Sequence, residues 1–263
     1  MKKIMTILAF IFMYSGMNAQ IIDTMFMLCQ YKHKNTIPRS SGVKVEIDTM
    51  NLETGKNISK FYSYHNKIVD SLRFASGVAA PTPYKKTASR YIIYTDYVKS
   101  NITFADHSMT TVEMFKYIEK LENQKWTIHD ETKKILSHTC KKATGRFKGR
   151  DYVAWYAVDI PVSRGPYKFN GLPGLILEIS DTESLFTFEC IAIETNHSAI
   201  INENKDDRLV SKKEYIDMVK KYNDNPRAGF EQLLKWSGAL NPSEASKHIS
   251  VEKIPYNPIE LEE

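Results

Sequence analysis

Hydrophobic and polar residues alternate in short runs along most of the chain. Residues 43–47 alternate between aliphatic and charged side chains. Residues 91–98 are rich in aromatic and β-branched side chains. Both patterns are typical of β-strands. Similar runs predict further strands at residues 26–31, 102–104, 126–129, 134–140, 152–158 and 185–193.

The segments between these runs predict turns, a loop and one ambiguous element. Residues 51–55 supply turn formers, and residues 58–72 show the pattern of two strands paired around a turn. Residues 77–90 contain two prolines and many small residues, which predicts an exposed loop. Residues 112–121 fit either a helix or a strand that ends at Tyr117.

The pattern becomes helical towards the C-terminus. Ser211 and Glu214 have the spacing of a capping box, and Pro226 stands near the start of a second predicted helix. Strands joined by short polar turns, followed by helices, argue against a doubly wound sheet. We therefore predict a mainly β (α+β) protein with a curved antiparallel sheet or half-barrel and C-terminal helices. Residues 20–203 would form the β domain, and residues 204–263 a helical segment and extended tail packed on it.

The N-terminus predicts a secretory signal. Lys2 and Lys3 precede an apolar run at residues 4–14, and residues 17–19 give an acceptable cleavage site. The run is short for a membrane span, which needs roughly 20 residues. We expect residues 1–19 to be a signal peptide, although an uncleaved anchor remains the alternative. Export to the periplasm, the outer-membrane surface or the medium follows, with no transmembrane segment after cleavage.

Composition and charge exclude several classes of function. Without the two lysines of the predicted signal, 34 basic and 31 acidic side chains remain, a formal net charge of +3. This charge is too small and dispersed to predict binding to nucleic acid or an anionic membrane. The chain has no phosphate-binding glycine loop, no Gly-x-Ser-x-Gly run and no Cys-x-x-Cys pair. We therefore expect no cofactor.

The three cysteines are Cys29, Cys140 and Cys190. Export would bring them into an oxidising compartment, and their odd number leaves at least one thiol unpaired. Cys140 and Cys190 both fall in predicted strands, so a disulfide between them is the favoured pairing. A pair that includes Cys29, or three buried thiols, are the alternatives.

The most specific run of the chain is Gly-Leu-Pro-Gly-Leu-Ile at residues 171–176. Pro173 fixes its own φ, which makes the run a stiff turn between apolar residues. Gly171 and Gly174 can take positive φ or let another backbone approach closely. If Gly174 takes positive φ, a valine in its place should cost about 1–3 kcal/mol.

The same run gives the chain a family resemblance. TGKNISKFYS at residues 54–63, GPYKF at residues 165–169 and YNPIEL at residues 256–261 occur with it in the expected order. The chain therefore resembles the GLPGLI family of secreted Bacteroidetes proteins over nearly its whole predicted mature length. Arg164 departs from the family pattern, in which an acidic or small residue often precedes Gly-Pro.

The resemblance implies little about chemistry, because the family has no established reaction. Its members are often encoded near TonB-dependent outer-membrane receptors, which implies work at the envelope. Their strand pattern resembles that of periplasmic lipoprotein carriers, which bind apolar ligands in a concave sheet. That likeness is one of fold, and fold alone does not determine function.

The best candidate binding residues lie between residues 150 and 172. They combine large apolar faces with polar groups and charge, which suits a peptide, sugar or lipid. The alternative is that the aromatic residues pack beneath a rigid loop that closes one end of the sheet, and the prolines and glycines favour this alternative. The candidate ligand-binding residues are Arg150, Trp155, Tyr156, Tyr167, Lys168, Phe169 and Leu172.

Two classes of function remain open. The first is a non-enzymatic envelope binding or accessory protein that works with a TonB-dependent outer-membrane receptor or binds an apolar or peptide ligand. It predicts a concave apolar cavity and no cluster of catalytic groups. The second is a secreted hydrolase or metal-handling protein built around His138 and Cys140, which would share one face of a strand. We favour the first class, and predict neither a catalytic residue nor a metal site.

Overall fold

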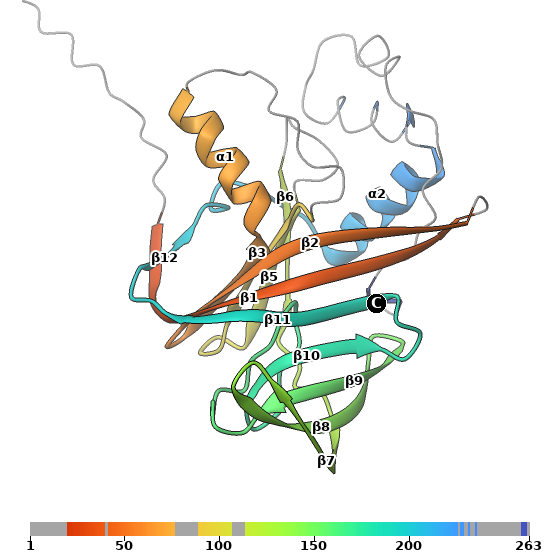
Figure 1. Cartoon of the computed structure of the whole chain (residues 1–263). Coiled ribbons are helices and arrows are strands. Elements are labelled where there is room, and N and C mark those ends of the chain that lie inside the picture. The colour runs from red at the N-terminus through yellow and green to blue at the C-terminus, as the bar shows by residue number, and fades with distance from the viewer. Residues whose placement is uncertain are drawn as a thin grey trace, which may run out of the picture.

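The computed structural model of the chain describes residues 20–39, 42–76, 89–106, 114–225 and 259–261, together with 227–228, 231 and 235. Its strands form one large, curved and unclosed sheet in which neighbours are mainly antiparallel (Figure 1). This confirms the predicted fold class.

The elements follow the chain in this order. The strands of the first half are β1 (Gln20–Arg39), β2 (Gly42–Gly55), β3 (Ile58–Ser63), β4 (Tyr91–Asp96), β5 (Asn101–Asp106) and β6 (Phe115–Lys120). The later strands are β7 (Trp126–Ile135), β8 (His138–Phe147), β9 (Arg150–Ala157), β10 (Leu175–Asp181), β11 (Phe186–Thr195), β12 (Ala199–Asn202) and β13 (Arg208–Leu209). The helices are α1 (Tyr64–Ser76) and α2 (Lys212–Asp224).

The sheet consists of two meanders that meet at one strand pair. Strands β1 to β6 lie side by side in sequence order, and so do β7 to β11. The meanders join where β1 pairs with β11. β1 also pairs with β2 along most of its length and, near its start, with β12. The short strand β13 pairs with β6 in parallel.

Inward-facing residues of both meanders share one core. Phe61 of β3 meets Phe188 of β11 edge to face, with ring centroids 5.9 Å apart. Tyr91 of β4 meets Tyr167, which follows β9, at 5.8 Å in the same manner. These contacts join strands that lie far apart in the sheet, so the sheet curls around its own hydrophobic face.

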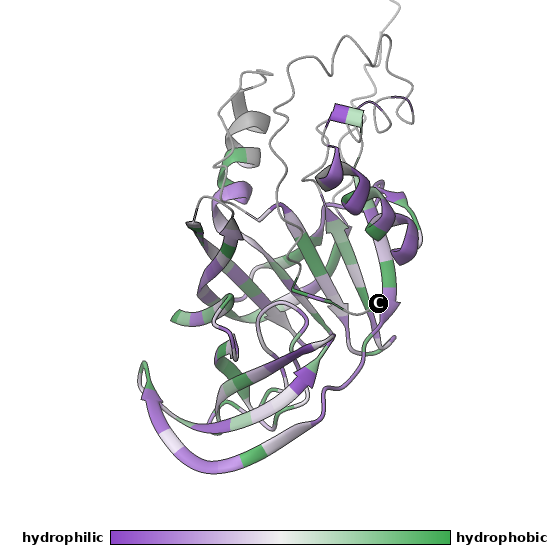
Figure 2. Ribbon diagram, turned by 90° about the vertical axis from the view of Figure 1, so that its right-hand side faces the viewer, coloured by the Kyte–Doolittle hydropathy of each residue, from purple (hydrophilic) through white to green (hydrophobic). Residues whose placement is uncertain are grey.

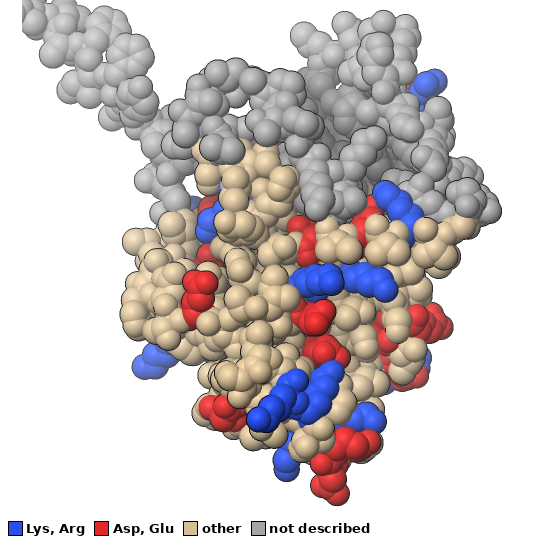
Figure 3. Space-filling model, viewed as in Figure 1, with Lys and Arg blue, Asp and Glu red and all other residues tan. Residues whose placement is uncertain are grey.

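Charged side chains of both signs lie on the outer surface. The hairpin of β7 and β8, at the end of the sheet opposite the helices, is mainly hydrophilic (Figure 2). On the face shown in Figure 3, basic and acidic side chains lie beside one another. Two ion pairs of this kind are Lys133 with Glu178 at 2.6 Å and Lys142 with Glu131 at 2.9 Å.

The predicted capping box is confirmed. The Ser211 hydroxyl accepts a hydrogen bond from the Glu214 amide at 3.2 Å, and the Glu214 carboxylate accepts one from the Ser211 amide at 2.8 Å. These bonds satisfy N–H groups that have no partner within the first turn of α2. The helix then packs Met218 against Phe115 of β6.

The prediction of two paired strands over residues 58–72 is wrong in its second half. β3 ends at Ser63 and α1 begins at Tyr64. The Ser63 hydroxyl accepts a hydrogen bond from the Asn66 amide at 3.3 Å, so it acts as the N-cap of the helix. Val69 is buried and anchors α1 against the sheet.

Two turns lie elsewhere than predicted. Residues 51–55 belong to β2, because residues 51–54 pair with both β1 and β3. Residues 134–140 are not one strand: Leu136, with a φ of 53°, lies in the turn between β7 and β8. For residues 112–121, the strand alternative is correct where the structure describes them, as β6.

Several predicted features lie wholly or mainly outside the described residues. These are the signal peptide at 1–19, most of the loop at 77–90 and the second helix after Pro226. They and the domain boundaries stay predictions. Within the described part of the chain, no helix has both the length and the apolar character needed to cross a membrane.

Candidate functional site

Residues 158–174 connect β9 to β10 and hold many of the predicted binding residues. An isolated β-bridge folds this connection back on itself. Gly171 has a φ of +91°, which glycine adopts at little cost. A Cβ on Gly174 would lie 2.1 Å from the carbonyl oxygen of Ala157 in β9. Gly171 therefore supplies a turn, and Gly174 permits a close approach of two backbones.

Four predicted ligand-binding residues lie in the hydrophobic core. Tyr156, Tyr167, Phe169 and Leu172 are each at most 8% exposed. Phe169 packs edge to face on Tyr152 with ring centroids 4.7 Å apart. In this position the rings contact other core residues, which matches the alternative of aromatic packing beneath a rigid loop. Their role in ligand binding stays a prediction.

Arg150 and Trp155 are not brought to the same place. Arg150 is buried, and its Nη1 lies 3.3 Å from Asp181 Oδ2. Trp155 is half-buried on the opposite face of β9 from Tyr156, because adjacent residues of a strand point to opposite sides. Lys133 Nζ lies 4.6 Å from the centroid of the Trp155 ring.

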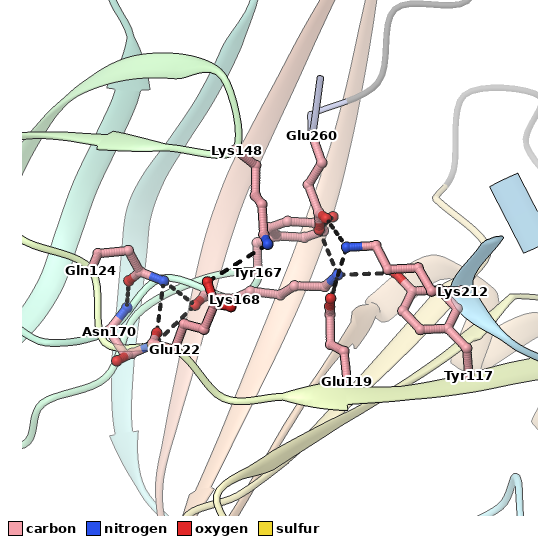
Figure 4. Close-up of polar contacts among 10 residues, drawn as sticks. All are labelled: Tyr117, Glu119, Glu122, Gln124, Lys148, Tyr167, Lys168, Asn170, Lys212 and Glu260. Atoms are coloured by element: carbon pink, nitrogen blue, oxygen red, sulfur yellow. Dashed lines mark hydrogen bonds and ion pairs between the residues drawn. The ribbon is translucent and has the colours of Figure 1, made fainter. Parts of the chain in front are cut away.

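Lys168, the remaining predicted residue, is the centre of a buried ionic cluster (Figure 4). Its Nζ donates to the carboxylates of Glu119 and Glu260, and to the Tyr117 hydroxyl at 3.0 Å. Lys212 Nζ lies 2.8 Å from an oxygen of each of the same two glutamates. We call these five residues the Lys168 cluster. It joins β6, the β9–β10 connection, the start of α2 and the C-terminal tail.

Two charged groups of the Lys168 cluster, Glu260 and Lys212, are held in their ionised forms. Burial acts to raise the pKa of Glu260, but the charges of Lys168 and Lys212 outweigh it and lower that pKa to about 2. Burial acts to lower the pKa of Lys212, but the carboxylates of Glu260 and Glu119 raise it. Groups that stay ionised near neutral pH are poor catalysts of proton transfer. The arrangement is suited to holding structure together.

The segment 259–261 is held against the sheet by further hydrogen bonds. The Tyr167 hydroxyl donates to Glu260 Oε1 at 2.7 Å. The Tyr152 hydroxyl donates to the Ile259 carbonyl at 3.3 Å, and the Leu261 amide donates to the Lys148 carbonyl at 2.9 Å. The end of the YNPIEL run therefore packs against the predicted binding segment.

His138 and Cys140 do not form a joint site. His138 Nδ1 lies 2.7 Å from Asp159 Oδ2 near the surface, whereas Cys140 is fully buried. Burial, followed by the charge of Asp159, raises the pKa of the Cys140 thiol to about 11. A neutral thiol is a weak nucleophile and a weak metal ligand. Over the described ranges, no group of three or more His, Cys, Asp or Glu side chains is placed to hold a metal ion.

The predicted disulfide between Cys140 and Cys190 is wrong. Cys140 lies on β8 and Cys190 on β11, with β9 and β10 between them. Three strand spacings amount to about 14 Å along a sheet, whereas bridged cysteines have Cα atoms roughly 4–7 Å apart. All three cysteines are buried free thiols.

A cavity of about 530 Å³ lies on the outer face of β4, β5 and β6. Tyr94, Thr103 and Ile118 line it, whereas their neighbours along each strand face the core. The first residues of β1, Ile58 of β3, the end of β12 and the segment after it also line the cavity. We call it the β4–β6 cavity. Its volume is typical of small-ligand sites, which span roughly 300–1,000 Å³.

The β4–β6 cavity combines aliphatic and cationic groups. Asp96 is its acidic lining residue, and Asp96 Oδ1 accepts hydrogen bonds from the amides of Val98 and Lys99 at 3.0 and 2.8 Å. Three lysines against one aspartate give the lining a positive balance. The aliphatic lining residues are Ile21, Ile22, Ile58 and Ile118, and the lysines are Lys99, Lys116 and Lys205.

Hydrogen bonds fix the wall of the cavity that follows β12. Lys116 Nζ donates to the carbonyl oxygens of Asn204 and Lys205 at 2.8 and 2.6 Å. The Tyr94 hydroxyl donates to Asn204 Oδ1 at 2.8 Å, and burial raises the pKa of Tyr94, so this donor stays neutral. Lys116 therefore supports the wall. Lys99 is the more exposed lysine, and its Nζ lies 3.5 Å from Asp96 Oδ2 at the rim.

Sequence reasoning missed this cavity. Its lining comes from segments that are separated along the chain, and each segment has the alternation of an ordinary strand. No spacing between its residues identifies a site. The polar positions on the outer face of residues 94–103 are a weak signal, because solvent-exposed strand faces are polar as a rule.

Comparisons with known proteins agree with the fold and leave the activity open. Residues 146–178, which include the Gly171–Ile176 run, match a family model described as a protein of unknown function (Porph_ging). No curated protein matches the chain.

Solved structures provide the second comparison. A structure of PNGF-II in space group P21 has a TM-score of 0.55 at 15% identity, covering 76% of this chain and 34% of that one. A second, in space group C2, has a TM-score of 0.51 at 15% identity, with 75% and 33% covered. The chain thus spans about a third of the length of these structures. At such identity the likeness shows the fold alone.

Proposed function

We propose that this protein is an exported, non-enzymatic binding or accessory protein of the cell envelope, and that its ligand occupies the β4–β6 cavity. The observation that carries the proposal is the cavity itself, with isoleucines beside a lysine-bearing rim. Contact with the isoleucines favours an apolar body, because burial of apolar surface is stabilising. Lys99 and Lys205 favour an acidic group on the same ligand. The ligand class is therefore a small amphipathic acid.

The alternative of a hydrolase or metal-handling protein has less support. In the described part of the chain, the histidine–carboxylate contact of His138 and Asp159 has Cys140 as its neighbour, and that thiol points into the core. The β4–β6 cavity itself offers lysines, amides and one engaged aspartate. A binding role uses these groups directly, whereas hydrolysis needs a base within reach of a nucleophile or water.

Export and a receptor partner rest on the sequence. The signal-like N-terminus and the resemblance to secreted proteins support export. The same resemblance suggests a TonB-dependent outer-membrane receptor as partner. Fractionation of cells that make the full chain tests the first point, and cross-linking from envelope extracts with mass spectrometry tests the second.

Ligand binding can be tested with 1-anilinonaphthalene-8-sulfonate, a fluorescent probe that has an apolar body and one negative charge. We expect saturable fluorescence enhancement that decanoate reverses and decylamine does not. Ile118→Asp should weaken probe binding about tenfold, because it places a charge on the apolar lining. Lys99→Glu should weaken it at least severalfold, because it reverses the charge at the rim.

Matched controls lie outside the cavity. Val43→Asp changes an exposed aliphatic residue at the tip of the β1–β2 hairpin, and Lys141→Glu reverses an exposed charge on β8. Both should bind the probe as the unaltered protein does. If the cavity variants and the controls behave alike, the ligand site is elsewhere. If decylamine competes as well as decanoate, the assignment of an acidic ligand is wrong.

A further inference from the structure

Two of the three cysteines lie next to the junction of the two meanders. Cys29 is on β1 and Cys190 is on β11, and these strands are antiparallel neighbours. Cys29 pairs with Ile193, and Cys190 pairs with Tyr31. The register shifts between these two pairs, so one residue of β11 is bulged out of the ladder.

Cys29 and Cys190 share the inner face of the sheet. Both are buried, at 0% and 3% exposure, as is Tyr31. Ile191, in the bulge, is 45% exposed and points outward. Cys29 and Cys190 therefore lie diagonally across adjacent strands on one face, at the bulge that shifts the register between them.

The pKa of Cys29 reflects the neighbouring thiol. A hydrogen bond with Cys190, ahead of burial, is the largest cause that raises the pKa of Cys29. Tyr31 is paired with Cys190 and lies two residues from Cys29 on β1, and burial followed by these two thiols raises its pKa. Cys140 has no part in this arrangement, because it lies three strand positions away on β8.

We propose that Cys29 and Cys190 form a disulfide in the exported protein, and that Cys140 is the odd thiol that remains. The bridge would link the two meanders at the strand pair through which they meet. The proposal of this disulfide rests on the proposed function only in that export supplies an oxidising environment. The pairing itself rests on the positions of the two cysteines in the sheet.

The oxidation is a thiol–disulfide exchange with an external disulfide, either a disulfide-bearing oxidoreductase or oxidised glutathione. The thiolate of one cysteine attacks the donor disulfide, forms a mixed disulfide and releases one donor thiolate. The thiolate of the other cysteine then attacks the protein sulfur of that mixed disulfide and releases the second donor thiolate. The donor gains two electrons, and the protein loses two thiol protons. Because both thiols are buried in the finished fold, we expect the bridge to form during folding and then to resist reduction.

The test is peptide mapping of the protein purified from an exporting host, alkylated with iodoacetamide without reductant. We expect one linked peptide pair containing Cys29 and Cys190, and alkylated Cys140 after denaturation. Cys140→Ser should retain the linked pair, and Cys29→Ser should leave Cys190 alkylated. The oxidised protein should melt about 10 °C above the reduced protein, because the bridge closes a long loop.

The mapping of the unaltered protein decides the question even where a cysteine variant fails to fold. Alkylation of all three cysteines without reductant would overturn the proposal, and so would a linked peptide that contains Cys140. Binding of the fluorescent probe in the β4–β6 cavity is measured separately. Its loss would count against the proposed ligand site and leave the disulfide unaffected.

Discussion

His33 is an imidazole kept neutral by its surroundings. It is 4% exposed and stacks on Phe188 with ring centroids 4.2 Å apart. Its Nδ1 lies 3.3 Å from the Thr187 carbonyl oxygen. Asp48 stands opposite on β2. Burial lowers the pKa of His33 to about 4, and the hydrogen bond to Thr187 offsets only part of this effect.

This environment predicts that acid destabilises the fold through His33. In the unfolded chain a histidine has a pKa of about 6.5. Below that pH the unfolded state takes up a proton that the folded state refuses, so stability falls as the pH drops from about 6.5 to 4. The lowering of the His33 pKa from the ordinary histidine value of 6.5 to about 4 corresponds to a loss of up to about 3 kcal/mol of folding stability. Urea denaturation at pH 7, 5.5 and 4 measures it.

The contribution of His33 can be separated from general acid effects. His33→Gln should lower stability at pH 7 but show a weaker fall between pH 7 and 4 than the unaltered protein. His197→Gln, at an exposed position after β11, should leave the pH dependence as it is. Equal falls in all three proteins would contradict the assignment. The sequence does not predict the lowered pKa of His33, because that pKa depends on which strands cover the side chain in the fold.

At the scale of elements, the two glycines of the β9–β10 connection serve different purposes. Two glycines flank Pro173, and positive φ was a natural expectation for either. Gly171 has it, whereas Gly174 stands directly before β10 and against the backbone of β9. The predicted cost of valine at position 174 assumed a positive φ, and Gly174 does not have one. Close packing of backbones is what excludes a side chain there.

Gly174→Ala is predicted to destabilise the protein by about 3 kcal/mol. The new Cβ would lie 2.1 Å from the Ala157 carbonyl oxygen and 2.9 Å from its carbon, and both belong to a paired strand that cannot move aside cheaply. Gly42→Ala is the comparison, since Gly42 has a φ of +126° and no atom within 4 Å of the added Cβ. It should cost about 1 kcal/mol from backbone strain alone. Chemical denaturation ranks the two, and an equal or smaller loss for Gly174→Ala would refute the close-approach argument.

How far the sequence predicts an element depends on whether its signals are local. The capping box of α2 lies within four residues and is predicted correctly at Ser211 and Glu214. α1 is missed because its cap, Ser63, also ends a strand, so the apolar residues that follow, such as Ile68 and Leu72, are read as a continuation of the strand pattern. The β7–β8 hairpin is misplaced because Leu136 takes a φ of 53° without a glycine to mark the turn.

At the scale of the whole molecule, the sheet brings together residues that sequence spacing cannot relate. Alternation predicts which residues of a strand share a face, but it does not say which strands will be neighbours. The β4–β6 cavity draws on β1, β3, β4, β5, β6, the end of β12 and the segment after it. The cysteine pairing failed for the same reason, because Cys140 and Cys190 both lie on strands that are not adjacent. The fold class is predictable, whereas the site depends on the strand order.

The Lys168 cluster helps to fix residues 259–261 to this sheet, together with the hydrogen bonds of Ile259 and Leu261. Lys168→Met removes a cation whose side chain is 1% exposed and leaves Glu119 and Glu260 with Lys212 alone. Loss of one partner from a buried ion pair costs about 3–5 kcal/mol. We therefore expect a large fall in the denaturation midpoint and faster proteolysis near the C-terminus. Lys142→Met, which disrupts an exposed pair with Glu131, should leave both nearly unchanged.

A double variant distinguishes loss of attraction from an uncompensated charge. Lys168→Met combined with Glu260→Met leaves Glu119 and Lys212 as a balanced pair at 2.8 Å. If the unpaired carboxylate is the main cost, the double variant should be more stable than Lys168→Met alone, because a buried ion pair replaced by apolar side chains is often tolerated. If the tail depends on the ionic contacts themselves, the double variant should be the less stable of the two. In the first case, Lys168→Met alone should be cleaved faster near the C-terminus than the double variant. In the second case, the double variant, which also lacks Glu260, should be cleaved faster.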